Sequence, residues 1–313
     1  MRVLVAGCAG FIGFHLCERL LADGHEVVGV DNLATGQRRN ADDLLRVRRF
    51  RFLEHDICQP LPRAALGRID LVCNLACPAS PVDFGTRPLE IMAVCSRGLW
   101  NLLDLARELG ARLLQTSTSE IYGDPLEHPQ RETYWGNVNP AGPRSCYDEG
   151  KRFGEALIAA YRRQYRTPIR VARIFNTYGP RMRADDGRAL PNFISQALSG
   201  RPLTVHGDGR QTRSFCYVAD QVEGLLRLAA SEVEEPVNIG NPVEVTLLEV
   251  AREVIELSGS RSTITHTDRM PDDPKVRCPD ISRARTLLGW EPHVARREGL
   301  LRTIAWFRQA ENV

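Results

Sequence analysis

Residues 1–13 read MRVLVAGCAGFIG, an apolar, β-branched run that is followed by three regularly spaced glycines. A strand, a tight glycine turn and a helix in this order form the phosphate-binding unit of dinucleotide-binding α/β proteins. In such a unit Gly7 permits the turn, Gly10 admits a pyrophosphate to the backbone, and Gly13 lets the helix pack on the strand. This segment therefore predicts a nucleotide-binding parallel sheet.

The first helix and the ends of the next two strands extend this predicted site. Phe11 and Ile12 begin the helix, so its N-terminus would face the phosphates. Asp31 ends the second strand, where its carboxylate can accept bonds from the adenosine ribose and would repel the 2′-phosphate of NADP. NAD is therefore the expected cofactor. Asp56 follows the third strand and can either bind the adenine amino group or cap a helix. We also expect cofactor contacts from residues beside these strand ends: Asn32, Ile57, Leu75 and Ala76.

Strand-like and helix-like segments alternate through the first half of the chain. We expect strands over Val3–Ala6, Glu26–Val30, Phe50–Leu53, Asp70–Asn74, Arg112–Thr116 and Arg170–Ile174. We expect helices over Phe11–Leu21, Met92–Leu109 and Asp148–Arg166. Such alternation predicts an α/β fold, a Rossmann-type doubly wound parallel sheet with helices on both faces.

The pattern changes after Asn176, where glycine-containing turns separate shorter elements. We predict that residues 1–176 form an NAD-binding Rossmann domain with returns near 212–240. Residues 177–211 and 241–313 would form a smaller, interleaved C-terminal lobe that binds the substrate. The elements expected in this half are helices Pro191–Leu198, Val218–Ala230, Leu247–Ser258 and Ile281–Leu288 and strand Val237–Ile239, of which Val218–Ala230 and Val237–Ile239 return to the first domain.

Composition excludes several other classes of protein. The 313 residues include 41 basic and 39 acidic side chains, and this balance gives no reason to expect a nucleic-acid surface. No signal peptide or membrane-spanning run is recognisable, so we expect no membrane association. Nine scattered cysteines match neither a zinc site nor a redox CxxC motif, which favours reduced thiols, a cytoplasmic location and no bound metal.

Tyr147 and Lys151 have the YxxxK spacing, which places both side chains on one face of a helix. An ammonium beside a phenol stabilises the phenolate, so we expect the pKa of Tyr147 to fall below about 10. The phenolate could then take a proton from a hydroxyl whose carbon loses hydride. Upstream, the segment TSTSEIYG ends the fifth expected strand, where Thr118 could bond the same hydroxyl and Glu120 could act as a second acid or base. Both could also merely cap a loop.

Taken together, these motifs resemble the extended short-chain dehydrogenase/reductase family. Five further segments resemble its UDP-glucuronate decarboxylase branch: NLACPASP at 74–81, YWGNVNPAGPRSCYDEGKR at 134–152, RIFNTYGPRM at 173–182, QTRSFCYV at 211–218 and DDPKVRCPD at 272–280. The likeness extends from the first strand to about Phe307. Two positions depart from the family pattern, since Cys95 replaces a usual Asn and Phe14 replaces a usual Ser.

The resemblance implies NAD-dependent decarboxylation of UDP-glucuronate to UDP-xylose. Oxidation at C4 of the sugar would place the carboxylate β to a new ketone, so that carbon dioxide leaves and an enolate forms. Protonation at C5 and return of the hydride would regenerate NAD. The sister 4,6-dehydratases carry an acidic residue directly before the glutamate, whereas this chain carries Ser119, a poor acid at neutral pH.

Two alternatives remain open on the sequence. One is another nucleotide-sugar enzyme, a 4-epimerase or 4,6-dehydratase acting on a related sugar. The other is a non-catalytic dinucleotide sensor on the same fold, since fold alone does not determine function. Retention of Thr118, Tyr147 and Lys151 together disfavours the sensor.

The resemblance also implies a substrate site. Arg213 and Arg277 lie in motifs that the family uses for the diphosphate, and a guanidinium suits phosphate oxygens. Arg188 is a weaker candidate, and Asn176 is expected to bond the sugar diphosphate. The backbone around Leu203–Val205 is the expected uracil seat. The remaining expected substrate contacts are Pro78, Ser119 and Glu120.

A homodimer is the expected assembly. The apolar stripes of helices Met92–Leu109 and Asp148–Arg166, together with the resemblance, imply that two copies pair these helices as a four-helix bundle. The alternative is that both stripes face only the sheet.

Overall fold

A parallel sheet of seven strands dominates the computed structural model, which describes residues 1–269 and 272–310. The strand order is β11-β6-β5-β4-β1-β2-β3. The strands are β1 (Arg2–Ala6), β2 (Glu26–Asp31), β3 (Phe50–Glu54), β4 (Leu71–Asn74), β5 (Arg112–Thr118), β6 (Ile169–Ile174) and β11 (Val237–Ile239). The order reverses between β1 and β4, and ligands bind beyond the carboxyl ends of strands at such a point. The predicted Rossmann-type fold is confirmed.

Strand β1 shows why this sequence forms a sheet that is covered on both faces. Val3 and Val5 pack into one apolar cluster, whereas Leu4 and Ala6 pack into a second cluster on the opposite face. All four side chains are fully buried. Alternate side chains of a strand point to opposite faces, so an unbroken apolar run suits a strand with helices on both sides.

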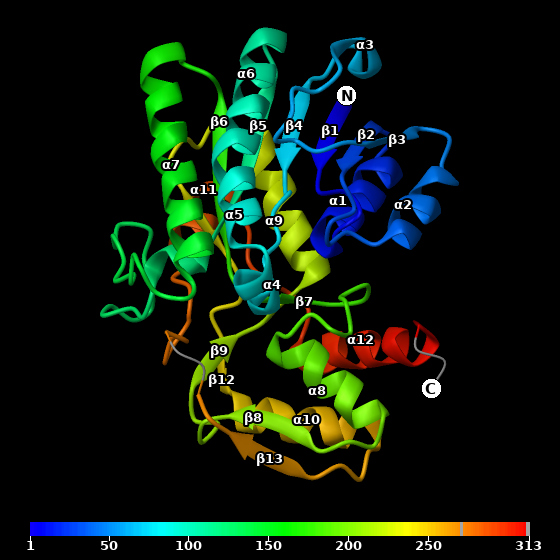
Figure 1. Cartoon of the computed structure of the whole chain (residues 1–313), viewed down its shortest axis with the longest axis vertical. Helices are drawn as coiled ribbons and strands as arrows, with labels where there is room; N and C mark the ends of the chain where they lie inside the picture. The colour runs from blue at the N-terminus through cyan, green and yellow to red at the C-terminus, as the bar shows by residue number, and fades with distance from the viewer. Residues whose placement is uncertain (270–271, 311–313) are drawn as a thin grey trace.

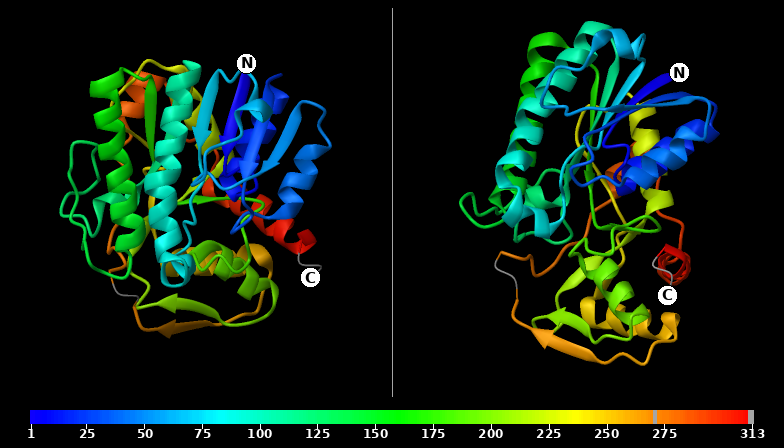
Figure 2. Two further views of the ribbon diagram at one scale, coloured as in Figure 1. Left: turned by 45° about the horizontal axis from the view of Figure 1, so that its top comes forward. Right: turned by 45° about the vertical axis from the view of Figure 1, so that its right-hand side comes forward.

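Helices cover both faces of the sheet (Figure 2). Helices α6 and α7 contact β4 and β5 on one face, and helices α1 and α9 contact β2, β5 and β6 on the other. The elements around the sheet are α1 (Phe11–Ala22), α2 (Arg38–Leu45), α3 (Arg63–Leu66), α4 (Pro81–Thr86), α5 (Pro88–Ala93), η1 (Val94–Gly98), α6 (Leu99–Leu109), η2 (Ser119–Tyr122), α7 (Ser145–Tyr165), α9 (Val218–Ala230) and α11 (Ser282–Leu288).

The expectation of one regular helix over Met92–Leu109 is wrong in detail. The segment consists of α5, a π-helical stretch η1 and α6, and it begins earlier, at Pro88. Apolar periodicity continues through a π stretch with only a local shift, so the pattern does not reveal it. Strand β5 also continues to Thr118, two residues beyond the expected end.

A smaller lobe lies below the carboxyl ends of the strands (Figure 1). Its strands pair as β10–β7, β12–β9 and β13–β8, and α10 packs against α8 and α12. Between these segments the chain returns to the main sheet, where β11 pairs in parallel with β6. The elements of the lobe are β7 (Thr177–Tyr178), α8 (Ala189–Leu198), β8 (Leu203–His206), β9 (Thr212–Ser214), β10 (Cys216–Tyr217), β12 (Glu244–Thr246), α10 (Leu247–Ser258), β13 (Ile264–Thr267) and α12 (Arg296–Ala310).

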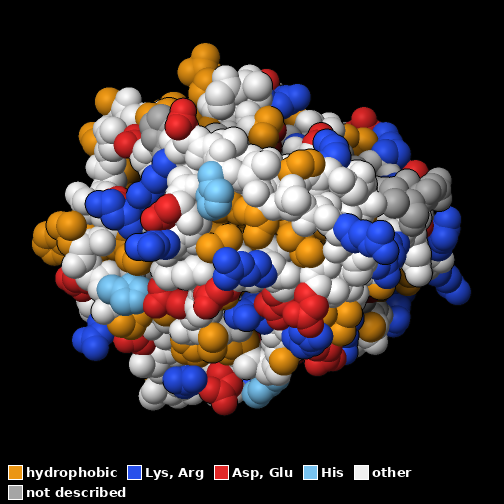
Figure 3. Space-filling view, turned by 90° about the horizontal axis from the view of Figure 1, so that it is seen from below, with side chains coloured by type: hydrophobic (Ala, Val, Ile, Leu, Met, Phe, Trp, Pro, Cys, Tyr) orange, Lys and Arg blue, Asp and Glu red, His pale blue; other side chains and the backbone are white. Residues whose placement is uncertain are grey.

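Seen from below, the described part of this face carries basic and acidic side chains interspersed with apolar ones (Figure 3). Of the helices in residues 1–269 and 272–310, none is long and apolar enough to cross a membrane. The predicted lobe boundaries, 177–211 and 241–313, differ from this arrangement at three elements: β9 and β10 pair with strands of the lobe, and α11 contacts β11 of the main sheet. Residues 270–271 and 311–313 of the predicted lobe lie outside those described.

Candidate functional site

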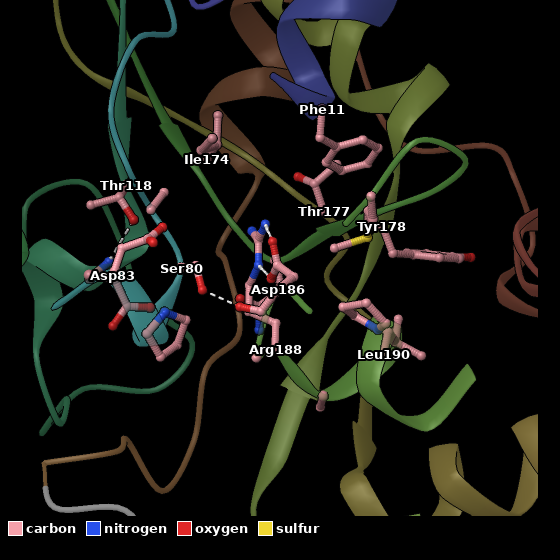
Figure 4. A pocket seen from close by; sticks show the side chains of 18 of the residues that line it. Phe11, Ser80, Asp83, Thr118, Ile174, Thr177, Tyr178, Asp186, Arg188 and Leu190 are labelled. Carbon is pink, nitrogen blue, oxygen red and sulfur yellow. Dashed lines mark hydrogen bonds and ion pairs between the residues drawn. The ribbon is translucent and has the colours of Figure 1, made fainter. Parts of the chain in front are cut away.

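A cleft lies between the carboxyl ends of the sheet strands and the C-terminal lobe. The sheet side is formed by the glycine loop after β1, by the segment after β4 and by the ends of β5 and β6. The lobe side is formed by residues before and within α8 and by β8 and β9. Figure 4 shows Thr118 and Ser80 on one side, Phe11 and Tyr178 on the other, and Arg188 between them.

Most of the residues predicted for the site line this single cleft. The lining includes Gly7, Gly10, Phe11, Ile12, Gly13, Leu75, Thr118, Ser119, Glu120, Tyr147, Lys151, Asn176, Arg188 and Arg213. The lining does not include the other predicted residues: Asp31, Asn32, Asp56, Ile57, Ala76, Pro78, Leu203, Val205 and Arg277.

The glycine loop forms a cradle that side chains would fill. Gly7 has a φ of +82°, and a Cβ there would lie 2.7 Å from the backbone of Leu75. A Cβ on Gly13 would lie 1.9 Å from the Gly7 carbonyl oxygen. Helix α1 begins after Gly10 without a side-chain cap, so its first backbone N–H groups face the cleft. These residues fit the diphosphate of a dinucleotide.

Asp31 is hydrogen-bonded to the backbone of the glycine loop. Its carboxylate accepts hydrogen bonds from the backbone N–H of Ala9 (3.0 Å) and of Leu33 (2.8 Å). Burial raises the pKa of Asp31, whereas these two hydrogen bonds lower it. Each carboxylate oxygen can accept a second bond, so the predicted ribose contact stays compatible with this geometry. Asp31 therefore also has a structural role that the sequence reasoning did not include.

Asn32 and Asp56 both close turns beside the cleft. The side chain of Asn32 accepts a bond from the backbone of Ala34, and that of Asp56 accepts one from Cys58 at 2.8 Å. At Asp56 this bond closes a turn and does not cap a helix, because α3 begins only at Arg63; the contact with adenine stays a prediction. The next residue, Ile57, is buried and packs against Gly98.

Thr118, Tyr147 and Lys151 meet on the sheet side of the cleft. Thr118 ends β5, and α7 carries the other two residues one turn apart. The Lys151 ammonium donates to the Thr116 carbonyl at 3.0 Å and lies 5.7 Å from the centre of the Tyr147 ring. The Tyr147 ring stacks on Phe84 at 5.0 Å. A strand end and a helix face thus bring together a hydroxyl, a phenol and a cation.

The electrostatics of this group correct one expectation. Burial raises the pKa of Tyr147 to about 12, although Lys151 and Thr118 act in the opposite direction. The predicted fall of this pKa is therefore wrong for the structure, because burial outweighs the nearby ammonium. Burial alone would lower the pKa of Lys151, but Cys77 and Tyr147 raise it overall, so the amine is charged at neutral pH.

Glu120 lies between two arginines. Arg277 donates to its Oε1 at 2.9 Å, and Arg144 donates to its Oε2 at 2.6 Å. Arg277 also donates to the hydroxyl of Ser119 at 2.9 Å. Burial would raise the pKa of Glu120, but Arg277 and Arg144 lower it to about 2. Glu120 is thus ionised at neutral pH and is a poor proton donor in this structure.

The sequence reasoning did not identify Arg144. It lines the cleft beside Glu120, and its guanidinium lies 5.3 Å from the centre of the Phe84 ring. Its place three residues before Tyr147, in the same motif, was the available signal.

Asp148 follows Tyr147, and burial together with the charge of Glu120 raises the pKa of Asp148 to about 7.

The other predicted arginines are paired with carboxylates. Arg213 donates to Asp273 at 2.7 Å, and Arg188 forms a two-pronged ion pair with Asp186. Arg188 and Asp186 lie in the middle of the cleft (Figure 4). Both guanidiniums lie on the lobe side of the cleft, and each is neutralised by its carboxylate partner.

Strand β8 presents alternate residues to the cleft. The side chains of Leu203 and Val205 are fully buried, whereas Thr204 and His206 line the cleft. The backbone of Leu203–Val205 remains the predicted uracil seat, since the prediction concerned main-chain groups. Strand alternation was the signal that could have added Thr204.

Phe14, one of the two departures from the family pattern, has a packing role. Its side chain is buried, and the guanidinium of Arg181 lies 4.0 Å from the centre of its ring. Arg181 is held there by Asp43 at 2.6 Å. Phe14 therefore stabilises the contact between α1 and the segment after β7.

Comparison with known proteins identifies relatives of the whole chain. The profile of the NAD dependent epimerase/dehydratase family matches residues 3–240. The chain is 50% identical over 308 residues to UDP-glucuronic acid decarboxylase 1 of Arabidopsis thaliana, which covers 98% of this chain and 70% of that protein. It is 49% identical over 308 residues to UDP-glucuronic acid decarboxylase 1 of Xenopus tropicalis, with 98% and 72% covered.

Solved structures share the fold over the full length. The UDP-glucose 4-epimerase of Thermotoga maritima, solved with UDP-glucose, superposes with a TM-score of 0.91 at 28% identity, covering 99% of this chain and 100% of that one. The UDP-glucuronic acid 4-epimerase of Bacillus cereus, solved with UDP-glucuronic acid and NAD, superposes with a TM-score of 0.90 at 31% identity, with the same coverage.

Proposed function

Since the chain belongs to the NAD dependent epimerase/dehydratase family, we propose that it converts UDP-glucuronate to UDP-xylose and carbon dioxide, with NAD as its cofactor. The observation that carries this proposal is the identity of about half of all residues with UDP-glucuronic acid decarboxylases of a plant and a vertebrate over nearly the full chain. Side chains of the types that the reaction needs line the cleft, which supports the proposal.

The chemistry follows from the substrate. When bound, NAD would supply the acceptor for a hydride from C4 of the sugar and would be the source of the hydride returned to the same carbon. Between these events the C5 carboxylate lies β to a ketone, so carbon dioxide can leave while the ketone oxygen takes up the electron pair. Protonation at C5 then gives the pentose. Loss of a carboxylate needs no acid to protonate a leaving hydroxyl, which agrees with Ser119 in that place.

We assign the proton transfer at the C4 hydroxyl to Tyr147. For this step Tyr147 must be ionised, and its pKa of about 12 makes the phenolate the minor form in this structure. Lys151, charged and one helical turn away, would stabilise that phenolate, and Thr118 would bond the same hydroxyl. Lys151 is held in place by its bond to the Thr116 carbonyl, so the cation does not depend on a ligand for its position.

The two arginines around Glu120 would make this wall of the cleft favourable for the sugar carboxylate. Arg144 lines the cleft directly. Arg277, which the sequence analysis expected at the diphosphate, is almost fully buried and contacts Ser119 and Glu120 in this structure. With a pKa of about 2, Glu120 would serve to hold and orient these cations. This assignment replaces the earlier expectation of a second acid or base.

The lobe side would bind the rest of the nucleotide. Arg213 and Arg188 would face the diphosphate, with Asn176 beside them on the sheet side. Their carboxylate partners Asp273 and Asp186 neutralise them in this structure, so binding would require the phosphates to replace or share those ion pairs.

A 4-epimerase is the second candidate, because the Bacillus cereus enzyme solved with UDP-glucuronic acid shares 31% of its residues with this chain. Both reactions would begin with the same oxidation. They differ in whether carbon dioxide leaves or the ketone is reduced from its other face.

One experiment separates these outcomes. Purified protein is incubated with UDP-glucuronate and NAD, and the products are identified by chromatography and carbon dioxide trapping. Decarboxylation predicts equimolar carbon dioxide and a UDP-pentose. UDP-galacturonate without carbon dioxide would establish the epimerase, and recovery of unchanged substrate would refute both.

We further propose that the protein is a cytoplasmic homodimer. Large apolar side chains are exposed on the outer faces of α5, α6 and α7, among them Leu89, Met92, Trp100 and Phe153. A second copy of the same surface would cover them. All nine cysteines are free, which agrees with a reducing compartment.

A further inference from the structure

Two thiols face each other next to the catalytic centre. The sulfur atoms of Cys77 and Cys95 lie 3.6 Å apart, close enough for a hydrogen bond between them. Cys77 follows β4 and lines the cleft, whereas Cys95 lies in the π-helical stretch η1. The two residues are eighteen positions apart and belong to separate elements, so this contact is a product of the fold.

The surroundings of the pair favour a reactive thiolate. Hydrogen bonding from Cys77 lowers the pKa of Cys95 to about 7 despite burial, and the ammonium of Lys151 acts in the same direction. A thiol with such a pKa is substantially ionised at neutral pH, and the thiolate is the form that reacts with oxidants. By contrast, burial raises the pKa of Cys58, the other partly exposed cysteine, to about 11.

The two cysteines differ in position: Cys77 faces the cleft, whereas Cys95 is packed against α7. Cys77 lines the cleft, so a small oxidant can approach the pair from that side. Hydrogen bonding to Cys95 and burial raise the pKa of Cys77, so the ionised sulfur is that of Cys95, which lies behind Cys77 at 3.6 Å. Cys95 is held tightly against α7, since a Cβ on Gly150 would lie 3.2 Å from its Cβ and 3.3 Å from its sulfur. Closing the remaining distance would therefore move the loop that carries Cys77.

We propose that Cys77 and Cys95 form a reversible disulfide under oxidising conditions and that this bond weakens NAD binding. The site is a redox modification site for a peroxide, distinct from the sugar chemistry. The experiments that test this proposal need NAD but no sugar substrate, so their outcome is independent of the proposed decarboxylation.

The oxidation balances with hydrogen peroxide as the oxidant. The ionised sulfur attacks the O–O bond, becomes a sulfenic acid and releases hydroxide, which is protonated to water. The second sulfur then displaces the sulfenic hydroxyl group, which leaves as a second water with the proton of that thiol. Two thiols and one peroxide give one disulfide and two waters, and a dithiol reductant reverses the change.

The effect on NAD follows from the position of the Cys77 loop. Leu75 lies two residues before Cys77 and packs closely on Gly7. A Cβ added to Gly7 would lie 2.7 Å from the backbone of Leu75. Its N–H also donates to the Ala6 carbonyl at 2.9 Å. Drawing Cys77 toward η1 would thus disturb the loop that cradles the dinucleotide. By linkage, bound NAD must oppose disulfide formation by the same factor.

The test starts with the full-length protein treated with hydrogen peroxide, with and without saturating NAD. Remaining thiols are alkylated, and the chain is cut with trypsin and with a protease that cleaves after Glu90, which separates Cys77 from Cys95. We expect mass spectrometry without reductant to find these two peptides linked. We also expect NAD affinity, measured by calorimetry, to fall by about tenfold and to recover with dithiothreitol.

Matched variants make the result decisive. Cys95→Ser should remove the link and make NAD affinity insensitive to peroxide, each variant being compared with its own untreated sample. Cys58→Ser alters the other partly exposed thiol and should behave like the wild type. Absence of the linked peptide at doses that oxidise other cysteines would overturn the proposal. So would an unchanged NAD affinity in linked protein, or equal loss of affinity in Cys95→Ser.

Discussion

Tyr147 is the residue on which the proposed hydride step depends most. Replacing it with Phe removes one hydroxyl from a buried ring that still stacks on Phe84, so folding and NAD binding should persist. Formation of NADH with UDP-glucuronate in a single turnover should fall on the order of 10²–10⁴-fold, because no base takes the C4 proton. Stopped-flow absorbance of NADH measures this rate. Near-normal NADH formation would show that another group is the base.

Glu120 should couple stability to acid pH. Its folded pKa of about 2 lies below the ordinary value of 4.5, so the folded carboxylate keeps its charge where the unfolded one is protonated. The resulting stabilisation, on the order of 3 kcal/mol, is present above the unfolded pKa and is lost as pH falls toward the folded pKa. The stability advantage of the wild type over Glu120→Gln should therefore shrink between about pH 5 and about pH 2.

Urea unfolding at several pH values measures that advantage. Asp148 titrates nearby, since burial and Glu120 raise its pKa to about 7, so both proteins are compared in an Asp148→Asn background. A difference that stays constant with pH would show that the Glu120 charge does not contribute to folding in this way.

Asp31 should contribute both to cofactor choice and to loop geometry. Asp31→Ala removes the proposed ribose acceptor and also the acceptor for the Ala9 and Leu33 N–H groups. We expect weaker NAD binding and a smaller preference for NAD over NADP, measured by calorimetry with both cofactors. Asp31→Asn keeps one acceptor oxygen and should lie between Ala and the wild type. Unchanged affinities in both variants would exclude Asp31 from the ribose site.

At the scale of elements, α5, α6 and α7 form one side of the molecule, and α7 contacts both α5 and α6 (Figure 2). Phe153 on α7 is 46% exposed, which is unusual for a large aromatic residue unless another surface covers it. Phe153→Arg should convert the proposed dimer to a monomer, because it places a charge in an apolar contact. Light scattering at micromolar concentration measures the mass.

The matched control lies on another helix. Leu301 on α12 is 48% exposed, so Leu301→Arg makes a similar change away from the proposed interface and should leave the mass unchanged. A monomeric wild type would refute the dimer, and a dimeric Phe153→Arg protein would place the interface elsewhere.

For the whole molecule, the proposed reaction predicts that NAD is regenerated in each catalytic cycle and is not consumed. Oxidation and reduction occur at the same carbon, so total NAD should remain constant while carbon dioxide accumulates. Absorbance of NADH during multiple turnovers, with carbon dioxide measured in parallel, checks this. NADH that accumulates in step with carbon dioxide would indicate an enzyme that releases the 4-keto sugar.

Sequence patterns within one or two neighbouring elements were enough to predict the Rossmann-type sheet and its helices. The glycine spacing, the alternation of strands and helices and the YxxxK pair depend on residues within one or two elements, so they are readable without tertiary contacts. The strand ends also placed Thr118 in the cleft correctly, because parallel strands present their carboxyl ends on one side.

Only the tertiary structure decided how distant groups modify one another. The pKa of Tyr147 depends on burial by elements far along the chain, and that of Glu120 depends on Arg277, more than 150 residues away. The Cys77–Cys95 contact arises because a loop after β4 meets a π-helical stretch that periodicity does not reveal. Spacing encodes local geometry, whereas desolvation and charge interactions depend on distances in space that only the folded chain defines.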